Sequence, residues 1–512
     1  MVGNHTHLKP SGHNHYDRAM KRAASGIMPV IAVDRNISQS LHRQIYDGYR
    51  SAIAGGSLRP GQRIPSSRAL ASEIGVSRFP VLNAYAQLLA EGYLESRVGA
   101  GTVVSSLLPD QLTSSGPAKA RLASARSGPR PVARRSLYPR RVQASPWLLG
   151  WGAFGVGQVA CDQFPLHVWS NLVARHCRSL DAQSLHYGNQ SGFRALRATI
   201  ADYLRTARSL RCDAEQVMIV SGSQQALEIS ARVLLDPGSP VWVEEPGYRL
   251  AQDAFVLNGC RLVPVPVDNE GLNVGAGIKR CPLARAAFVT PSHQYPLGVT
   301  MSASRRLQLL DWAQDTGSWI IEDDYDSEYR YESMPIASLQ GLDANARVIY
   351  VGTFSKVLFP SLRLGYVVIP SDLVDSFITV RRAMDLGPPT FYQEVLADFI
   401  GEGHFVRHIR RMRVLYRERR SALVNSIHEE LGSTVKILGG EAGMHLTVTL
   451  PKGKHDQEIT ERAARQNLWI RPLSPSYLGR VARPGFILGF GSTAVAEIPR
   501  AVRKLRKLLA DE

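Results

Sequence analysis

The stretch GTFSKVLFPSLRLG, residues 352–365, places Lys356 directly after a Thr-Phe-Ser run and Arg363 seven residues further on. The run before it, RVIYVG (347–352), is rich in β-branched and aromatic residues, which is typical of a buried strand. In layered α/β proteins, ligands bind beyond the carboxyl ends of strands. The stretch therefore predicts an α/β domain with an amine at its ligand-binding edge.

Similar short apolar runs recur along the second half of the chain, and each precedes turn residues or a helical pattern. These runs are QVMIV (216–220), PVWVEE (240–245), AAFVTP (286–291), WIIEDD (319–324) and GYVVIP (365–370). Strands that alternate with helices favour a largely parallel sheet covered by helices. We therefore predict a large α/β domain over residues 159–512.

Polar and aromatic residues follow several of these predicted strands. They stand in the segments VSGSQQALEI (220–229), EEPGYR (244–249), IIEDDYDSEY (320–329) and GTFSK (352–356). Because the strands are predicted to end at one edge of the sheet, we expect these segments to meet there. Each segment alone is a weak signal, but the four in this order point to one site.

The residue types in these segments match the chemistry of pyridoxal phosphate (PLP). Its aldehyde needs a lysine for an imine, its pyridinium nitrogen a carboxylate, its ring a flat partner, and its phosphate N–H donors and an arginine. Lys356 is the predicted catalytic residue and forms the imine. The other predicted cofactor residues are Asp323 for the ring nitrogen, Tyr325 for the phenolic oxygen, Tyr248 for stacking, and Ser223, Gln224, Thr353, Ser355 and Arg363 around the phosphate.

The order and wording of these segments resemble fold-type I aminotransferases over most of residues 160–500. PSHQYPLG (291–298) resembles a segment of that family whose asparagine touches the cofactor's phenolic oxygen; here Tyr295 or its neighbour His293 replaces the asparagine. LHYGNQSGFRALR (185–197) is similar to a stretch whose tyrosine reaches across a dimer interface to the partner's phosphate. The resemblance implies a homodimer in which Tyr187 plays this part.

The segment from 37 to 105 has a different pattern. Leu41, Ile45, Tyr49 and Ile53 form an apolar stripe at helical spacing that ends at a Gly-Gly pair. Two shorter helices follow around a Gly-Val turn, with Ser66 or Ser67 as the expected N-cap of the first and Ser77 of the second. GYLESRVGAGTVV (92–104) predicts two short strands around a glycine turn.

This segment resembles the winged helix-turn-helix of the GntR family of bacterial regulators over about 65 residues. The resemblance implies that the helix beginning near Arg78 enters the major groove of double-stranded operator DNA, with Arg78 reading a base. Pro80 departs from the family pattern but is tolerated in a first helical turn. The DNA-binding residues implied are Arg63, Ser66, Arg68, Ser77, Arg78, Gly99 and Gly101.

The fold class is therefore multidomain: an α+β winged helix-turn-helix domain at 37–105, and a large α/β PLP-dependent transferase domain of fold type I at 159–512. Residues 1–36 are polar at their start and predict a disordered leader. Residues 106–158 are rich in Ser, Ala, Pro, Gly and Arg and predict a flexible basic linker. The HTH and HNH tripeptides (5–7 and 13–15) lack a carboxylate or cysteine framework, and we expect no metal site.

Charge and cysteines narrow the class of protein further. A formal net charge of +17 favours a polyanionic partner. The 5 cysteines contain no CxxC pair, which argues against a disulfide framework and favours a reducing cytoplasm. No apolar run of about 18 residues and no secretory signal is visible, so we expect no membrane association.

A GntR-like domain joined to an aminotransferase-like domain is identified as the architecture of the MocR subfamily of transcriptional regulators. The resemblance implies a head-to-tail homodimer that senses PLP itself or an amino compound and regulates genes of amino-nitrogen or vitamin B6 metabolism. The alternative is an active aminotransferase with a tethered or autoregulatory DNA-binding domain. An aminotransferase needs an arginine for the substrate carboxylate, yet the matching position in GFILGFGSTA (485–494) is Phe486 or Ile487, which leaves Arg471 or Arg483 as substitutes.

Overall fold

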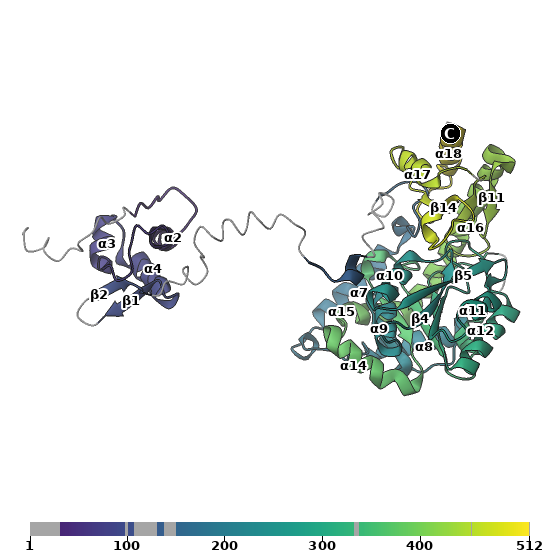
Figure 1. Ribbon diagram of the computed structural model, residues 1–512, viewed down its shortest axis with the longest axis horizontal. Coiled ribbons are helices and arrows are strands. Elements are labelled where there is room, and N and C mark those ends of the chain that lie inside the picture. Colours follow the sequence, from purple (N-terminus) through teal and green to yellow (C-terminus); the bar gives the residue numbers. More distant parts are fainter. Residues whose placement is uncertain are drawn as a thin grey trace, which may run out of the picture. The chain divides into compact units, whose positions relative to one another are not determined.

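The computed structural model describes residues 31–97, 101–106, 131–137, 150–331, 337–451 and 453–510. The chain divides into two compact units, Met1–Pro131 and Val132–Glu512, which we call the head and the body (Figure 1). Each unit has its own apolar core. No helix of the described part is long and apolar enough to cross a membrane.

In its described residues the head has three helices and a two-stranded hairpin. Its elements are α2 (Leu41–Ala54), α3 (Ser67–Glu73), α4 (Arg78–Ala90), β1 (Leu94–Arg97) and β2 (Gly101–Val104). α2 buries Ile45, Tyr49 and Ile53 of the predicted stripe, and also Tyr46. β1 and β2 pair antiparallel as expected of a wing, with Leu94 opposite Val104. The predicted DNA-binding residue Gly99 lies outside the described residues.

The two predicted helix caps differ in their contacts. Ser66 is the N-cap of α3, and its hydroxyl accepts a hydrogen bond from the Ala69 amide at 3.2 Å. Ser77 stands at the N-cap position of α4, but its side chain makes no capping hydrogen bond. The Ser77 hydroxyl is therefore left to other partners at the start of the helix.

The boundaries of the two units differ from the predicted leader and linker. Ile31, within the predicted leader 1–36, is 7% exposed and belongs to the apolar core of the head. Phe154, within the predicted linker 106–158, is fully buried in the body. Apolar residues at the edges of polar segments thus extend both units. The remaining leader and linker, residues 1–30, 107–130 and 138–149, lie outside the described part, and the predictions of disorder and flexibility there stay predictions.

The body is built on an eight-stranded sheet, in the order β3-β10-β9-β8-β7-β4-β5-β6. The strands are β3 (Val217–Val220), β4 (Pro240–Glu245), β5 (Arg261–Asp268), β6 (Gly271–Leu272), β7 (Ala286–Val289), β8 (Trp319–Asp324), β9 (Val348–Thr353) and β10 (Gly365–Val368). Neighbours from β9 through β5 pair in parallel, which confirms the predicted largely parallel sheet. β10 runs antiparallel to both β9 and β3.

The reversal between β9 and β10 positions the lysine of the opening stretch. The chain leaves β9 at Thr353 and returns in β10 at Gly365, opposite Thr353. Lys356 and Arg363 therefore both lie in the connection beyond the carboxyl end of β9. This is the edge at which the sequence predicts the ligand.

Helices cover both faces of this sheet. The helices of the body are α7 (Leu166–Arg178), α8 (Arg194–Arg208), α9 (Ser223–Leu234), α10 (Arg249–Leu257), α11 (Val274–Arg280), α12 (Ala303–Thr316), α13 (Leu339–Leu342), α14 (Val374–Asp385), α15 (Phe391–Gly401), α16 (His404–Leu431), α17 (Asp456–Ala464) and α18 (Ile498–Ala510). One core joins the sheet to α9, α10 and α14, and another joins it to α11 and α12. Short 3-10 turns are η1 (Arg134–Leu137), η4 (Cys161–Gln163), η5 (Gln183–Leu185), η6 (Ala214–Gln216), η7 (Pro360–Leu362), η8 (Ser371–Leu373), η9 (Gly432–Thr434) and η10 (Ser474–Ser476).

A second, four-stranded antiparallel sheet closes the body. Its order is β11-β12-β14-β13, formed by β11 (Lys436–Leu438), β12 (His445–Thr449), β13 (Arg471–Pro472) and β14 (Gly485–Gly489). Figure 1 shows this sheet together with α17 and α18, coloured yellow-green to yellow, at one end of the body. Its strands bring residues from the last quarter of the chain to the ligand edge of the larger sheet.

Candidate cofactor and DNA-binding sites

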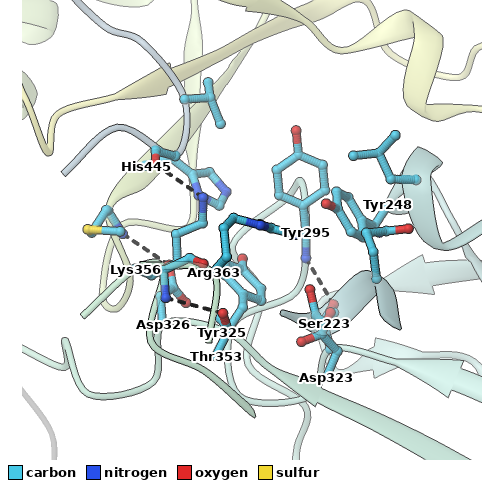
Figure 2. Close-up of a pocket in the computed structure, with 17 residues that line it drawn as sticks. Ser223, Tyr248, Tyr295, Asp323, Tyr325, Asp326, Thr353, Lys356, Arg363 and His445 are labelled. Carbon is cyan, nitrogen blue, oxygen red and sulfur yellow. Dashed lines mark hydrogen bonds between the residues drawn. The ribbon is translucent and has the colours of Figure 1, made fainter. Parts of the chain in front are cut away.

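A cavity of about 210 Å³ lies where the strand ends of the large sheet meet the small sheet. Every predicted cofactor residue except Tyr187 lines it: Lys356, Asp323, Tyr325, Tyr248, Ser223, Gln224, Thr353, Ser355 and Arg363. Figure 2 shows Lys356 and His445 on one side of the cavity and Tyr248 and Ser223 on the other. The ends of the strands therefore bring together residues that are more than a hundred positions apart in the sequence.

Lys356 extends into the cavity from the β9–β10 connection. Its Nζ donates a hydrogen bond to the carbonyl of Gly157 at 3.1 Å. Burial, and then the positive charge of Arg471, lower the pKa of Lys356 to about 8. Gly157 has a φ of +79°, and a Cβ there would lie 2.5 Å from Nζ. The positive φ of Gly157 therefore favours glycine beside the lysine. The amine of Lys356 has a substantial neutral fraction near pH 8.

Asp323 is the penultimate residue of β8 and pairs with Val351 of β9. Its side chain is 3% exposed, and its Oδ1 has no hydrogen-bond partner in the described part of the chain. Burial, and then the charges of Asp324 and Asp326, raise the pKa of Asp323 to about 8. A buried carboxyl without a partner is costly, so Asp323 is suited to pair with a cationic N–H group in the cavity.

The carboxyl behind Asp323 is already neutralised by the protein. Asp324 forms a buried ion pair with Arg208 at 2.7 Å and accepts a hydrogen bond from the Tyr350 hydroxyl. Arg208 also donates to the Ser292 hydroxyl at 2.7 Å. The two adjacent aspartates therefore differ: Asp324 is paired through its Oδ2, although its Oδ1 has no hydrogen-bond partner in the described part, whereas Asp323 lines the cavity and can pair with a ligand.

The first turn of α9 forms an anion-binding end of the cavity. Gly222, with a φ of +99°, caps this 12-residue helix, whose free amide groups begin at Ser223. Arg363 lies against Gly222, where its Nη2 donates to the Ser221 carbonyl at 2.7 Å. The Ser355 hydroxyl is buried without a partner in the described part. Amides, a guanidinium and a free hydroxyl together fit a phosphate group.

Tyr295 and His293 are the two residues of PSHQYPLG (291–298) that could replace the asparagine of the aminotransferase family. The structure places them in different surroundings. Tyr295 lines the cavity, and its ring meets that of Tyr248 edge to face at 5.4 Å. His293 does not line the cavity; its Nδ1 lies 3.0 Å from Asp326. The Tyr325 hydroxyl donates to the His293 carbonyl at 2.9 Å. Tyr295 is thus the residue of this segment that faces a ligand.

Arg471 is a cation beside the cavity residue Tyr295, and the apolar runs that predict the strands did not indicate this position. It stands on β13 directly opposite Ile487 of β14, one of the apolar positions where the sequence lacks an arginine. Its Nη1 donates to the Tyr295 hydroxyl at 2.8 Å, and its Nε is buried without a partner in the described part. β13 therefore carries an arginine directly beside the position at which β14 has an apolar residue.

Two histidines and one aspartate near the cavity are close enough to hold a metal ion. Ligand atoms of His293, Asp326 and His445 lie within 4.8 Å of one another. Asp326, however, lies against His293 and also accepts from the Met444 amide at 3.2 Å, while His445 Nε2 donates to the Pro296 carbonyl at 3.2 Å. Burial keeps the pKa of His445 well below its usual value. His293 and Asp326 therefore bond each other and His445 bonds a backbone carbonyl, so each of the three side chains already has a partner within the protein.

Tyr187 is not part of the cavity within one chain. Its side chain is 86% exposed and lies in a separate surface hollow with Leu185, Leu386 and Thr390. Leu185 is 77% exposed. Large apolar side chains at the surface are typical of an interface, and Tyr187 does not line the cavity of its own chain.

In the head, most of the predicted DNA-binding residues gather around α3 and α4. Arg63, Arg68, Ser77 and Arg78 are exposed, and Arg78 Nε donates to the Ser67 hydroxyl at 3.1 Å, which joins the first turns of the two helices. Gly101 begins β2 with a φ of +82°, and a Cβ there would lie 3.3 Å from Arg63 Nη2. Ser66 is occupied as a cap.

Sequence reasoning missed several residues that line the cavity. Asp326 stands within the quoted EDDYDSE motif and could have been included from it. His445 and Met444 come from β12 and its approach, and Val156 and Gly157 from the predicted linker. No local pattern marks these positions, because they reach the cavity only when the small sheet packs on the large one.

The fold and the cavity define a body of the aminotransferase class I and II type, joined to a winged helix-turn-helix head. The family model described as "Aminotransferase class I and II" matches residues 153–487, and that of "Bacterial regulatory proteins, gntR family" matches residues 41–104. The chain belongs to the MocR subfamily of GntR-family transcriptional regulators, which carry both parts.

Three relatives illustrate this membership. The probable rhizopine catabolism regulatory protein MocR of Rhizobium meliloti is 40% identical, over 93% of this chain and 95% of its own. The pyridoxine biosynthesis regulator PdxR of Corynebacterium glutamicum is 32% identical, over 90% and 94%. Among solved structures, the α-aminoadipate aminotransferase LysN of Thermus thermophilus, complexed with N-(5'-phosphopyridoxyl)-L-leucine, matches with a TM-score of 0.68 and 29% identity, over 74% of this chain and 97% of that one.

Proposed function

We propose that this chain is a PLP-dependent, DNA-binding transcriptional regulator whose body senses PLP itself or an amino compound of amino-nitrogen or vitamin B6 metabolism. One observation carries the proposal: a cavity lined by the Lys356 amine and the unpartnered carboxyl of Asp323 lies in the same chain as a winged helix-turn-helix head. The names of MocR and PdxR, regulators of rhizopine catabolism and pyridoxine biosynthesis, support it.

The residues of the cavity fit PLP group by group. Asp323 offers its buried carboxyl to the pyridinium N–H, and Tyr248 and Tyr295 offer ring faces and edges beside it. Ser355, Arg363 and the first turn of α9 would hold the phosphate. When bound, PLP supplies an aldehyde that is reactive toward amines. Lys356, with a pKa of about 8, offers a neutral amine to it.

An effector amine would compete with Lys356 for the same aldehyde. If the effector carries a carboxylate, Arg471 is the cation placed to bind it, since it borders Tyr295 and lowers the pKa of Lys356 by its charge. Release of Lys356 breaks its contacts in the cavity. Such a change can shift the arrangement of the heads if the two arrangements bind the ligand with different affinity.

A working aminotransferase remains the second candidate, and Arg471 is the observation that favours it. An arginine that grips a carboxylate can orient the substrate for proton abstraction. Multiple-turnover assays with a panel of amino donors and keto acids separate the two candidates. Turnover above roughly 1 s⁻¹, within the range typical of enzymes, would count against a body that only senses.

We expect Arg78→Ala to remove specific DNA binding. Arg78 is exposed at the start of α4, and a bidentate arginine–guanine contact contributes about 2 kcal/mol of discrimination, or roughly 30-fold. The measurement is a footprint and titration of the full-length protein on the DNA upstream of its own and neighbouring operons. Arg43→Ala, which removes the same charge from α2, is the control and should retain the footprint. Unchanged affinity in Arg78→Ala would remove this residue from the interface.

We also propose that two chains associate head to tail, so that Tyr187 of one chain completes the cavity of the other. The support is the exposed pair Leu185 and Tyr187 beside a surface hollow. We expect sedimentation of the full-length protein at micromolar concentration to give a dimer, and Tyr187→Ala to bind PLP more weakly while staying dimeric. A monomer that binds PLP with full affinity would contradict the proposal.

A further inference from the structure

The outward face of α4 carries apolar side chains. Val81, Ala84, Tyr85 and Leu88 turn into the core of the head. The residues on the opposite side are exposed and follow the helical spacing i, i+3, i+4 and i+7: Phe79, Leu82, Asn83 and Ala86. Phe79 is 71% exposed and Leu82 is 41% exposed. This helix is therefore apolar on both of its faces, with one asparagine on the outer one.

The other long helix of the head does not share this property. The exposed residues of α2 include Arg43, Arg50 and Ser51, as expected of a helix whose outer face meets water. Burying a side chain such as Phe79 in a complex stabilises the complex by about 2 kcal/mol, relative to leaving that side chain exposed to water. The outer face of α4 is thus suited to contact a partner.

The charges next to this face identify the chemistry of the partner. Arg78 precedes Phe79 and is tied to Ser67, so that the exposed Arg68 lies near the same end of α4. A partner must accept arginines at this end and apolar contact along the helix. The DNA major groove meets both requirements, because phosphates flank it and each thymine presents a C5-methyl group within it.

We infer that Phe79 and Asn83 of α4 read A·T base pairs: the Phe79 ring packs against a thymine C5-methyl group, and Asn83 makes a bidentate contact with an adenine. This inference rests on the proposed DNA-binding function and extends it from Arg78 to the face beyond. Asn83 lies one turn after Phe79, so its amide reaches a base step adjacent to the one that Phe79 contacts. Asparagine matches the N6 donor and N7 acceptor of adenine. Leu82 widens the apolar contact.

The test uses the full-length protein and the duplex that it enriches from a pool of random 30-base-pair sequences. Each thymine of that duplex is replaced in turn by uracil, which removes only the methyl group. We expect uracil at one thymine of each half-site to weaken binding about fourfold, the effect of one buried methyl group. Phe79→Ala should weaken binding to the thymine duplex about tenfold and remove the difference between thymine and uracil.

Further variants separate the roles of the residues. Asn83→Ala should lose the preference for adenine at one position while it keeps the uracil effect. Leu283→Ala, at a similarly exposed apolar residue of the body, is the control and should change neither. Because Phe79 is exposed, Phe79→Ala should melt at the same temperature as the unmodified protein, so that reduced binding cannot be attributed to misfolding.

The possible outcomes of these binding experiments test the inference about Phe79 separately from the proposed DNA-binding function. If one sequence is enriched but no uracil substitution weakens its binding, the inference about Phe79 is wrong and the DNA-binding function stands. If Phe79→Ala keeps its DNA affinity but changes the sedimentation of the protein, the face contacts a second copy instead. If no sequence is enriched over the random pool, the proposed function fails and the inference fails with it.

Discussion

Lys356→Ala will lose covalent attachment of PLP completely. Lys356 is the lysine that lines the cavity, and its pKa of about 8 provides the neutral amine that attachment needs. Alanine has no nitrogen to replace it. The unmodified protein, incubated with PLP and passed through a desalting column, should keep a visible absorbance band, and borohydride reduction should leave the added mass on the peptide that contains Lys356.

Two controls make this experiment specific. Lys436→Ala changes an exposed lysine on β11 and should keep the band. Lys356→Arg keeps a positive charge in the cavity but cannot form the link, so it should also lose the band. Ligand at 100 times its dissociation constant adds about 2.7 kcal/mol to the free energy of unfolding, and both Lys356 variants should lose most of the resulting rise in melting temperature. An unchanged band in Lys356→Ala would reject the proposed cofactor site.

Arg471→Gln should change two measurable properties of the cavity. The charge of Arg471 is the second largest cause, after burial, of the low pKa of Lys356. Because a nearby positive charge disfavours the ammonium form, its removal will raise the pKa of Lys356 toward the ordinary lysine value of about 10.4. We expect the rate of PLP attachment to the unmodified protein to rise with pH as Lys356 loses its proton, with a midpoint near pH 8. In Arg471→Gln this midpoint should move to higher pH.

The second effect of Arg471→Gln concerns effectors that carry a carboxylate. Loss of a charge-assisted contact in a desolvated site costs about 3 kcal/mol, so affinity for such amino acids should fall roughly 100-fold. Amines without a carboxylate should bind as before, which makes them the matched ligands for the comparison. Arg471→Lys keeps the charge and should leave the pH midpoint nearly in place while it loses bidentate binding. An unchanged midpoint in Arg471→Gln would contradict the electrostatic role of Arg471.

Many of the residues that line the cavity belong to short sequence motifs, so they could be predicted from the sequence. Asp323, Tyr325, Thr353 and Lys356 each lie at or just beyond the end of a strand that an apolar run predicts, and a largely parallel sheet brings such strand ends to one edge. The winged helix-turn-helix could be predicted equally well, since α2 and α4 repeat apolar residues at helical spacing and the sequence between the two wing strands contains glycine.

Other features depended on contacts between distant segments. The sequence offers the apolar residues Phe486 and Ile487 where an aminotransferase has an arginine, and only the pairing of β13 with β14 puts Arg471 opposite Ile487. The choice between Tyr295 and His293 required the packing of β12, because His445 and Asp326 occupy the space around His293. Gly157, predicted to lie in a linker, became part of the site because Phe154 anchors this segment in the core.

The sequence by itself determined the class of protein, the two folds, the lysine and the residues at the strand ends, because each of these is encoded by short-range periodicity and by motifs within a few residues. The tertiary structure alone decided which arginine lies beside Tyr295, which of the two adjacent aspartates lines the cavity, and where the two units begin. These depend on strand register and burial, which are set by residues far apart in the chain.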